Sequence, residues 1–329
     1  SVKTLLNGQF MKDFETYTTD QFVGRDGWIA LKSTTERVLG KKENNNVYFA
    51  AGDTLISRFD EPDGEKVTNN LNYVNNFVEN VDIPVTFSLI PTQACIWADR
   101  LPAGAPNASQ TAILEQAKAA VPGASWADLY TPLWEHKGED IFYRTDHHWT
   151  SLGAYYGLSA LAESMGLPCP ALDSYTDRHV VSEEFYGTTW SSSGFSWVDP
   201  DTMEIFVDEP EGLKVTSYPE GSPVEGKLYD FSFLEKKDKY SMFMGGNCPM
   251  HVIETGAEDK PSLLILRDSY TDSLIPFLLD DFSEIHVLDL RYYRASLKAY
   301  MEQNDFDNVL VCYSVSNFCT DSNIFLLGM

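Results

Sequence analysis

Short apolar runs alternate along this chain with segments in which apolar positions recur at helical spacing. The runs, typical of strands buried inside a sheet, lie at 47–51, 85–90, 263–266, 285–288 and 309–313. Helical spacing predicts helices at 67–79, 110–120, 151–166, 270–279 and 296–303, and a short strand is expected near 126–129. The alternation predicts an α/β fold in which helices cover both faces of a parallel sheet.

Two parts of the chain break this rhythm. Residues 1–40 carry large apolar side chains at helical intervals and predict helix up to Gly40. Residues 172–259 lose the helical period and are rich in Gly, Ser, Thr, Pro and aromatic residues, with short alternating runs such as 203–207. We predict a single domain over 1–329 with 172–259 as a β-rich insertion lying against the main sheet, since a free linker would not carry so many aromatic residues.

The charge of the chain excludes some partners. Lys and Arg number 24 against 49 Asp and Glu, so the net charge is −25 at pH 7. An acidic surface of this kind repels nucleic acid and anionic lipid, and we expect no nucleic-acid partner. No run reaches the roughly 18 to 20 apolar residues of a membrane-spanning helix. The chain opens on polar residues without an initiator Met, which is compatible with a removed signal peptide.

The cysteines predict neither a metal site nor a catalytic thiol. They show no Cys-x-x-Cys pair and no zinc-like spacing with histidine, and their odd number leaves at least one thiol free. The five are Cys95, Cys169, Cys248, Cys312 and Cys319.

The stretch 146–149 reads Asp-His-His-Trp, although the chain has only six histidines in all. The Thr and Ser at 150–151 are good N-caps, so this stretch is a loop that directly precedes the helix at 151–166. A loop anchored by a buried helix can hold side chains in fixed geometry, and the spacing of Asp146 and His148 can turn both toward one cleft.

Two other interpretations of this loop stay open. In the first, an Asp side chain caps the helix and two partly buried histidines only pack. In the second, Asp146, His147 and His148 bind a metal ion, although no further ligand accompanies them at helical spacing.

Ser269 follows the apolar run 263–266 after a sharp turn and precedes the predicted helix at 270–279, which Pro276 is expected to kink. Open α/β sheets place reactive residues at the C-terminal ends of interior strands. Backbone N–H groups and the dipole at a helix start stabilise a developing oxyanion there. The alternative for Ser269 is an ordinary N-cap.

Asp-His-His-Trp with a downstream Asp268-Ser269 resembles the DHHW protein family of Gram-positive bacteria, and through it the SGNH-like O-acetyltransferases that modify exopolysaccharides such as alginate. In those enzymes an Asp-x-His-Trp loop supplies the acid and base, and a serine after a later strand is the nucleophile. The resemblance assigns these roles to Asp146, His148 and Ser269. The other positions that carry it are Thr145, Trp149, Gly153, Ala154, 89–93 and 313 onward.

Two positions depart from the family pattern. Arg267 stands in place of the glycine of the usual Gly-Asp-Ser, and His147 in place of the Thr common in alginate enzymes. These departures bear on the oxyanion hole and the substrate more than on the triad.

The resemblance implies an SGNH-hydrolase-like (flavodoxin-like) parallel sheet sandwiched by helices, and transfer or removal of an acyl group, above all acetyl, on a cell-surface or extracellular glycan. His148 would take the proton of Ser269 while Asp146 fixes its tautomer. The Ser269 N–H would contribute to the oxyanion hole, together with Asn247 or Asn317, for each of which a turn role is equally expected.

Further residues are expected around the cleft. Arg291 and Tyr292 would line it, although a surface salt bridge is as strongly predicted for Arg291. Gln93 would lie where the family builds its cleft, and His147 would either contact substrate or pack.

The resemblance implies no cofactor. The expected partners are a glycan or an acetylated small molecule as substrate, and a membrane acyl-transporter. The expected location is extracellular or at the cell surface. The competing hypothesis is a secreted protein that binds a glycan on the same fold without catalysis.

Overall fold

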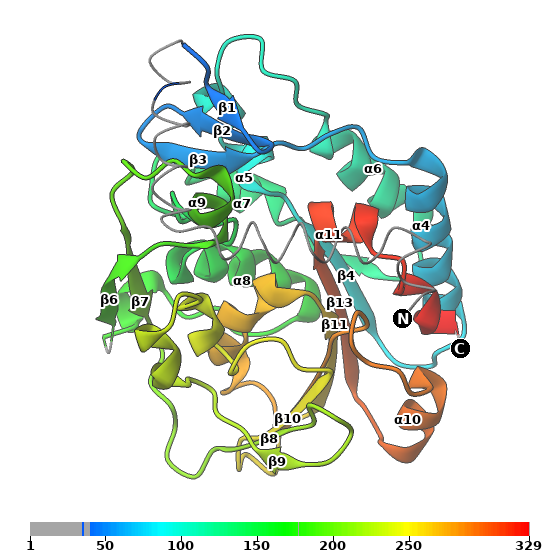
Figure 1. Ribbon diagram of the computed structural model, residues 1–329. Coiled ribbons are helices and arrows are strands. Elements are labelled where there is room, and N and C mark those ends of the chain that lie inside the picture. The colour runs from blue at the N-terminus through cyan, green and yellow to red at the C-terminus, as the bar shows by residue number, and fades with distance from the viewer. Residues whose placement is uncertain (1–34, 36–39, 177, 329) are drawn as a thin grey trace, which may run out of the picture.

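The computed structural model describes residues 35, 40–176 and 178–328. The helix predicted within residues 1–40 lies outside the described residues, except at positions 35 and 40. The centre of the described part is an eight-stranded mixed sheet with the order β5-β4-β13-β11-β12-β10-β8-β9 (Figure 1).

Five neighbouring strands of this sheet are parallel. In spatial order they are β5 (Ser125–Trp126), β4 (Val85–Ile90), β13 (Asn308–Ser314), β11 (Ser262–Arg267) and β12 (Glu284–Leu288). The last four of these strands coincide with apolar runs, so the prediction of buried strands there is confirmed. Leu266 pairs with Leu288 on one side and Val311 on the other, so the strands end together along one edge of the sheet.

The other three strands run antiparallel. β10 (Met250–Glu254) pairs with β12, β8 (Lys214–Ser217) pairs with β10, and β9 (Val224–Glu225) pairs with β8. The prediction of an all-parallel sheet is therefore wrong at this edge. Residues 172–259 also do more than lie against the sheet, because these three strands extend it. Antiparallel strands need no crossover helix, which is why this part lacks the helical period.

Two smaller sheets lie outside the main one. β1 (Glu43–Asn44), β2 (Val47–Ala50) and β3 (Thr54–Ser57) form an antiparallel sheet. β6 (His179–Phe185) and β7 (Asp201–Ile205) form a two-stranded sheet from the segment 172–259.

Helices lie on both sides of the main sheet, with α4 (Gly64–Glu79) and α6 (Gln110–Ala120) on one side and α8 (Ser151–Met165) on the other (Figure 1). The helices predicted there are confirmed. Each begins where a side chain accepts hydrogen bonds from first-turn N–H groups, and the capping residues are Asp63, Ser109 and Thr150.

The helix predicted at 270–279 is wrong. The chain forms two 3-10 helices there, η5 (Ser269–Ser273) and η6 (Ile275–Leu278). Pro276 has no N–H group, and its ring would clash with the carbonyl four residues earlier in an α-helix. Ser269 therefore begins a single short turn without the dipole of a long α-helix.

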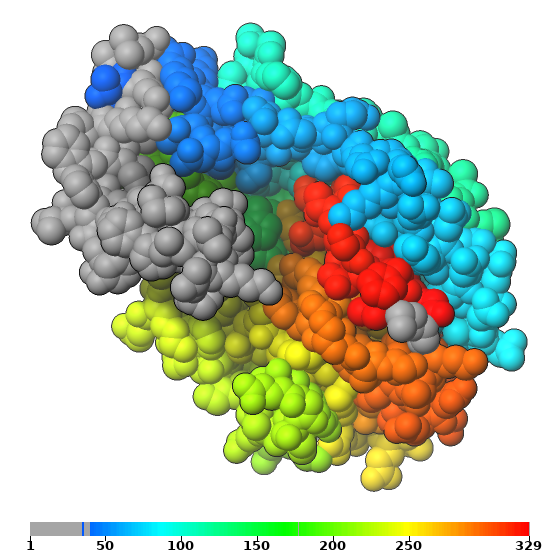
Figure 2. Space-filling model, turned by 45° about the vertical axis from the view of Figure 1, so that its right-hand side comes forward, coloured from blue at the N-terminus to red at the C-terminus, as the bar shows by residue number. Residues whose placement is uncertain are grey.

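The remaining helices complete the covering layers. They are α5 (Gln93–Ile96), η1 (Ala98–Arg100), α7 (Tyr130–Glu135), η2 (Leu172–Ser174), α9 (Thr188–Ser193), η3 (Phe231–Glu235), η4 (Tyr240–Met242), α10 (Leu297–Gln303), α11 (Val315–Thr320) and η7 (Ile324–Gly328). The red η7 lies on the surface beside α4 and α10 (Figure 2). Across the described ranges, no helix has both the length and the apolar character needed to cross a bilayer.

Candidate active site

The C-terminal end of the loop Asp146–Trp149 is tied to the segment before it. Phe142 and Trp149 form an antiparallel bridge, and the Thr150 N–H donates to the Ile141 carbonyl at 3.0 Å. Thr150 then caps α8 through its side chain. The loop therefore enters α8 at a fixed point.

Trp149 joins this loop to the turn that carries Ser269. Its side chain is fully buried, and its indole N–H lies 2.8 Å from the Tyr270 carbonyl, to which it donates. A Cβ atom at Gly157 of α8 would lie 2.8 Å from the Trp149 ring, so glycine is needed there for the indole to pack. The indole thus fixes the spacing between the two parts of the site.

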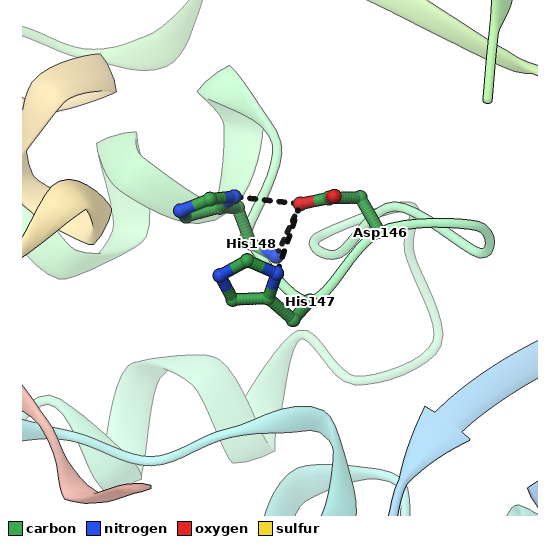
Figure 3. A group of neighbouring side chains, drawn as sticks. All are labelled: Asp146, His147 and His148. Carbon is green, nitrogen blue, oxygen red and sulfur yellow. Dashed lines mark hydrogen bonds and ion pairs between the residues drawn. The ribbon is translucent and has the colours of Figure 1, made fainter. Parts of the chain in front are cut away.

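The structure brings Asp146, His148 and Ser269 together. His148 Nδ1 lies 2.6 Å from Asp146 Oδ1, and His148 Nε2 lies 2.8 Å from Ser269 Oγ. Figure 3 shows the carboxylate facing the Nδ1 edge of the imidazole. Because an ionised carboxylate can only accept, Nδ1 carries the proton and Nε2 accepts the Ser269 hydroxyl. In this tautomer His148 can act as a general base toward Ser269.

Asp146 receives two hydrogen bonds from a residue far along the chain. The Thr188 N–H and hydroxyl donate to Asp146 Oδ2 at 2.7 and 2.8 Å. Burial alone would raise the pKa of Asp146, but His147, His148 and these hydrogen bonds hold that pKa well below its usual range. The close approach requires Gly187, since a Cβ atom there would lie 2.2 Å from Asp146 Cβ. Asp146 is therefore a buried carboxylate that stays ionised.

Tyr240 supports the other face of His148. The two rings are stacked with centroids 3.7 Å apart and an interplanar angle of 4°. The Tyr240 hydroxyl donates to the Ser269 carbonyl at 3.1 Å, so this residue contacts both partners of the His148–Ser269 pair. Sequence reasoning missed Tyr240 and Thr188. The only signal was the high aromatic and hydroxyl content of residues 172–259.

Asp268 holds the serine turn against β13 and α11. It is fully buried and accepts the Ser314 N–H at 2.8 Å, the Ser314 hydroxyl at 2.7 Å and the Asn317 side-chain amide at 2.7 Å. Asn317 thus lies next to Ser269 and supports Asp268. Its contribution to an oxyanion hole stays a prediction.

Arg267, which replaces the family glycine, does not enter the cleft. Its side chain is 0% exposed and pairs with Asp272 at 2.9 Å and Asp289 at 3.5 Å. Burial, together with nearby carboxylates, raises the pKa of Asp272 to about 7, although Arg267 opposes that rise. Arg291 also pairs with Asp289, at 2.6 Å, so Asp289 is shared by two guanidinium groups.

The other predicted residues lie in different settings. Arg291 is one quarter exposed and forms the predicted salt bridge, with Asp289. Tyr292 and Asn247 are exposed, and their contact with substrate stays a prediction. The side chain of Gln93 is buried and its amide donates to the carbonyls of Tyr143 and Asp146, while its predicted place in the cleft stays a prediction. It therefore holds the loop from beneath.

A metal ion remains a competing interpretation of the loop. Donor atoms of Asp146, His147 and His148 all lie within 4.8 Å of one another. However, both Asp146 oxygens already accept hydrogen bonds, from His148 and Thr188, and a metal ion would compete with these donors for the carboxylate. The hydrogen-bonded arrangement as it stands suits acid-base chemistry instead.

Comparisons with known proteins agree with this fold. A family model for DHHW proteins matches residues 88–288. The crystal structure of a DHHW family protein from Eubacterium siraeum matches with a TM-score of 0.73 and 26% identity, covering 87% of this chain and 96% of that one. No curated protein sequence matches the chain significantly.

Two more distant structures share the fold. Bacillus cereus PatB1 with a sulfonyl adduct matches with a TM-score of 0.67 and 20% identity, covering 83% of this chain and 96% of that one. The O-acetyltransferase domain of Pseudomonas putida AlgJ matches with a TM-score of 0.53 and 15% identity, covering 84% and 93%. At these identities the likeness concerns the fold alone.

Proposed function

We propose that this chain, which belongs to the DHHW protein family, is a serine acyl-transfer enzyme: an O-acetyltransferase or acetylesterase that acts on a cell-surface or extracellular glycan. The observation that carries the proposal is the continuous hydrogen-bonded chain from Asp146 through His148 to Ser269, with distances of 2.6 and 2.8 Å. Nucleophile, base and orienting carboxylate within hydrogen-bond reach are the signature of an activated serine.

In the proposed reaction, Ser269 Oγ attacks the acyl carbonyl carbon and its proton passes to His148 Nε2. Asp146 holds the Nδ1–H and stabilises the imidazolium, and the stacked Tyr240 ring adds a cation–π contact. His148 then gives the proton to the leaving oxygen, which leaves an acyl ester on Ser269. In the second half of the reaction, water or a glycan hydroxyl attacks that ester, again with His148 as base.

The negative oxygen of the intermediate needs donors. We assign the Ser269 N–H to this role, with Asn247 or Asn317 as the second donor. Since η5 is short, these individual donors would carry more of the stabilisation than a helix dipole.

The wider setting belongs to the same proposal. The fold would be an SGNH-hydrolase-like sandwich forming one domain over 1–329, with 172–259 as its insertion. The substrate would be a glycan or acetylated small molecule, the partner a membrane acyl-transporter, and the location extracellular or at the cell surface. The fold shared with the O-acetyltransferase domain of AlgJ supports this setting.

The decisive experiment labels the serine. Phenylmethanesulfonyl fluoride should add one sulfonyl group to the wild type, and peptide mapping should find it on Ser269, whereas Ser269→Ala should stay unlabelled. Wild type should also release acetate from p-nitrophenyl acetate, with no loss after chelator treatment. Zinc-dependent activity would instead support a metallohydrolase. An inert serine, combined with glycan binding that Ser269→Ala leaves intact, would establish the binding-protein hypothesis.

A further inference from the structure

His147 differs in exposure from its neighbours in the loop. Its side chain is 37% exposed, whereas those of Asp146 and His148 are 1% and 6% exposed. The rings of His147 and His148 nevertheless lie close, with centroids 3.9 Å apart. His147 is therefore an imidazole beside the triad that can reach a ligand.

The hydrogen bonds around His147 determine which nitrogen carries its proton. His147 Nδ1 lies 2.7 Å from Thr188 Oγ1, and that hydroxyl lies 2.8 Å from Asp146 Oδ2. Because the ionised Asp146 can only accept, the Thr188 hydroxyl donates to it and accepts the Nδ1–H of His147. The partial burial of its ring and the neighbouring His148 lower the pKa of His147 to about 4, so the ring is neutral at pH 7. His147 Nε2 is then an unprotonated acceptor.

The free nitrogen of His147 points to the reacting side. Figure 3 shows the two imidazoles side by side, each with one ring nitrogen toward Asp146 and the other directed away from it on a common side. On that side His148 Nε2 contacts Ser269 Oγ at 2.8 Å. Within residues 40–176 and 178–328, no side chain or backbone N–H donates to His147 Nε2. Two ring nitrogens that can accept hydrogen bonds thus face the same side, and one of them contacts the nucleophile.

On the basis of the proposed acyl transfer, we propose that His147 Nε2 binds a second hydroxyl of the acyl acceptor, on the carbon adjacent to the one that bears the reacting hydroxyl. The site then selects vicinal diols, such as those of sugar rings and polyols. The reacting hydroxyl oxygen forms the new bond to the acyl carbon and gives its proton to His148 Nε2. The bond from that carbon to Ser269 Oγ breaks, and Oγ takes the proton back from His148.

The neighbouring hydroxyl keeps its proton and donates to His147 throughout the step. Water carries no such second hydroxyl, so His147 favours transfer over hydrolysis. His147 acts as a specificity-determining residue, since the same His148 serves as base for every acceptor.

A pair of small acceptors isolates this interaction. p-Nitrophenyl acetate serves as donor, and ethylene glycol is compared with 2-methoxyethanol, whose ether oxygen cannot donate to Nε2. The measured quantity is the ratio of ester product to free acetate for each acceptor, corrected for the two equivalent hydroxyls of ethylene glycol. This ratio does not depend on how much acyl-enzyme forms. Wild type should prefer ethylene glycol by about fivefold to tenfold, the effect of one added hydrogen bond.

Matched variants separate the two ring nitrogens. His147→Asn keeps a polar atom near Nδ1 but has none at Nε2, so the preference should fall to about 1. His147→Gln reaches the Nε2 position with an amide oxygen and should restore part of the preference. The control is His179→Asn, the same change at an exposed histidine of β6, which should keep the wild-type preference.

A wild-type preference that persists in His147→Asn, or no preference in wild type, would overturn the inference while leaving acyl transfer intact. A wild type that neither consumes the donor nor acylates Ser269 would instead refute the proposed function, and intact-mass measurement distinguishes the two results.

Discussion

The two halves of the candidate site are held in place in different ways. The Ser269 turn is fixed by the main sheet itself, because buried Asp268 accepts hydrogen bonds from Ser314 at the end of the adjacent strand β13. The backbone of the Asp146–Trp149 loop is also tied to residues outside 172–259, but the side chains of Asp146 and His148 are held by that segment, through Thr188 and Tyr240. The nucleophile thus belongs to the regular part of the fold, and the acid-base pair is oriented by its least regular part.

This difference indicates how each half tolerates change. A turn between parallel strands is constrained by many neighbouring backbone hydrogen bonds. A loop held by a few contacts from a distant segment can lose its geometry through a single substitution there.

The largest effects should come from the triad itself. His148→Ala should lower kcat for an acetyl ester by about ten thousandfold or more, because it removes the base. Asp146→Asn should also lower kcat, but by a factor about tenfold to a hundredfold smaller than in His148→Ala, since the nucleophile and the base remain. Steady-state kinetics with p-nitrophenyl acetate measures both. Equal losses in the two variants would show that Asp146 does more than orient His148.

In the part of the site that carries Ser269, the buried carboxyl of Asp272 should make the stability of the protein depend on pH. Its folded pKa of about 7 lies above its ordinary value of 3.8, so the folded state binds the extra proton between these values. The contribution of Asp272 to the free energy of unfolding is therefore present below about pH 4 and is lost as pH rises through 7, by up to about 4 kcal/mol. Asp272→Asn cannot ionise and should lack this loss.

Urea unfolding of wild type and Asp272→Asn from pH 4 to 8 measures the difference. His251, whose pKa burial lowers to about 3, contributes in the opposite direction but is present in both proteins and cancels. A difference that stays constant with pH would mean that Asp272 is ionised throughout beside Arg267.

Gly187 tests the loop half. Gly187→Ala places a Cβ atom 2.2 Å from Asp146 Cβ, so the segment and the loop must move apart. Crowding of this kind should cost about 1 to 3 kcal/mol of stability, and loss of the Thr188 hydrogen bonds should lower kcat as well. Gly138→Ala is the matched control, since nothing lies within 4 Å of the added atom there. Thermal unfolding and ester turnover of the two variants should differ clearly, and equal behaviour would refute the close-contact argument.

Substitutions of Tyr240 should have the smallest effect on kcat. Two variants distinguish the role of its ring from that of its hydroxyl. Tyr240→Leu removes the aromatic face on which His148 stacks and should lower kcat by about tenfold, because the imidazolium that forms during the reaction loses its cation–π contact. Tyr240→Phe keeps the ring and should lose only the hydrogen bond to the Ser269 carbonyl. If both variants lose kcat by the same factor, stacking does not stabilise the imidazolium.

Local patterns were sufficient for much of the fold. The strand at 85–90 and the helix at 110–120 have the predicted bounds, because each depends on its own apolar spacing. The pattern failed at 270–279, where Pro276 changes the helix type, and at the antiparallel edge formed by β10 and its neighbours.

The sequence by itself determined the buried strands, the capped start of α8, the loop position of Asp146 and His148, and the strand-end position of Ser269. Each follows from apolar period, capping chemistry or spacing within about one element, or from the resemblance carried by short motifs. Only the tertiary structure decided that Thr188 bonds Asp146, that Tyr240 stacks on His148 and that Gln93 supports the loop from below. Thr188 lies 42 residues from Asp146, and a contact across that separation depends on the path of the whole chain, which no local period encodes.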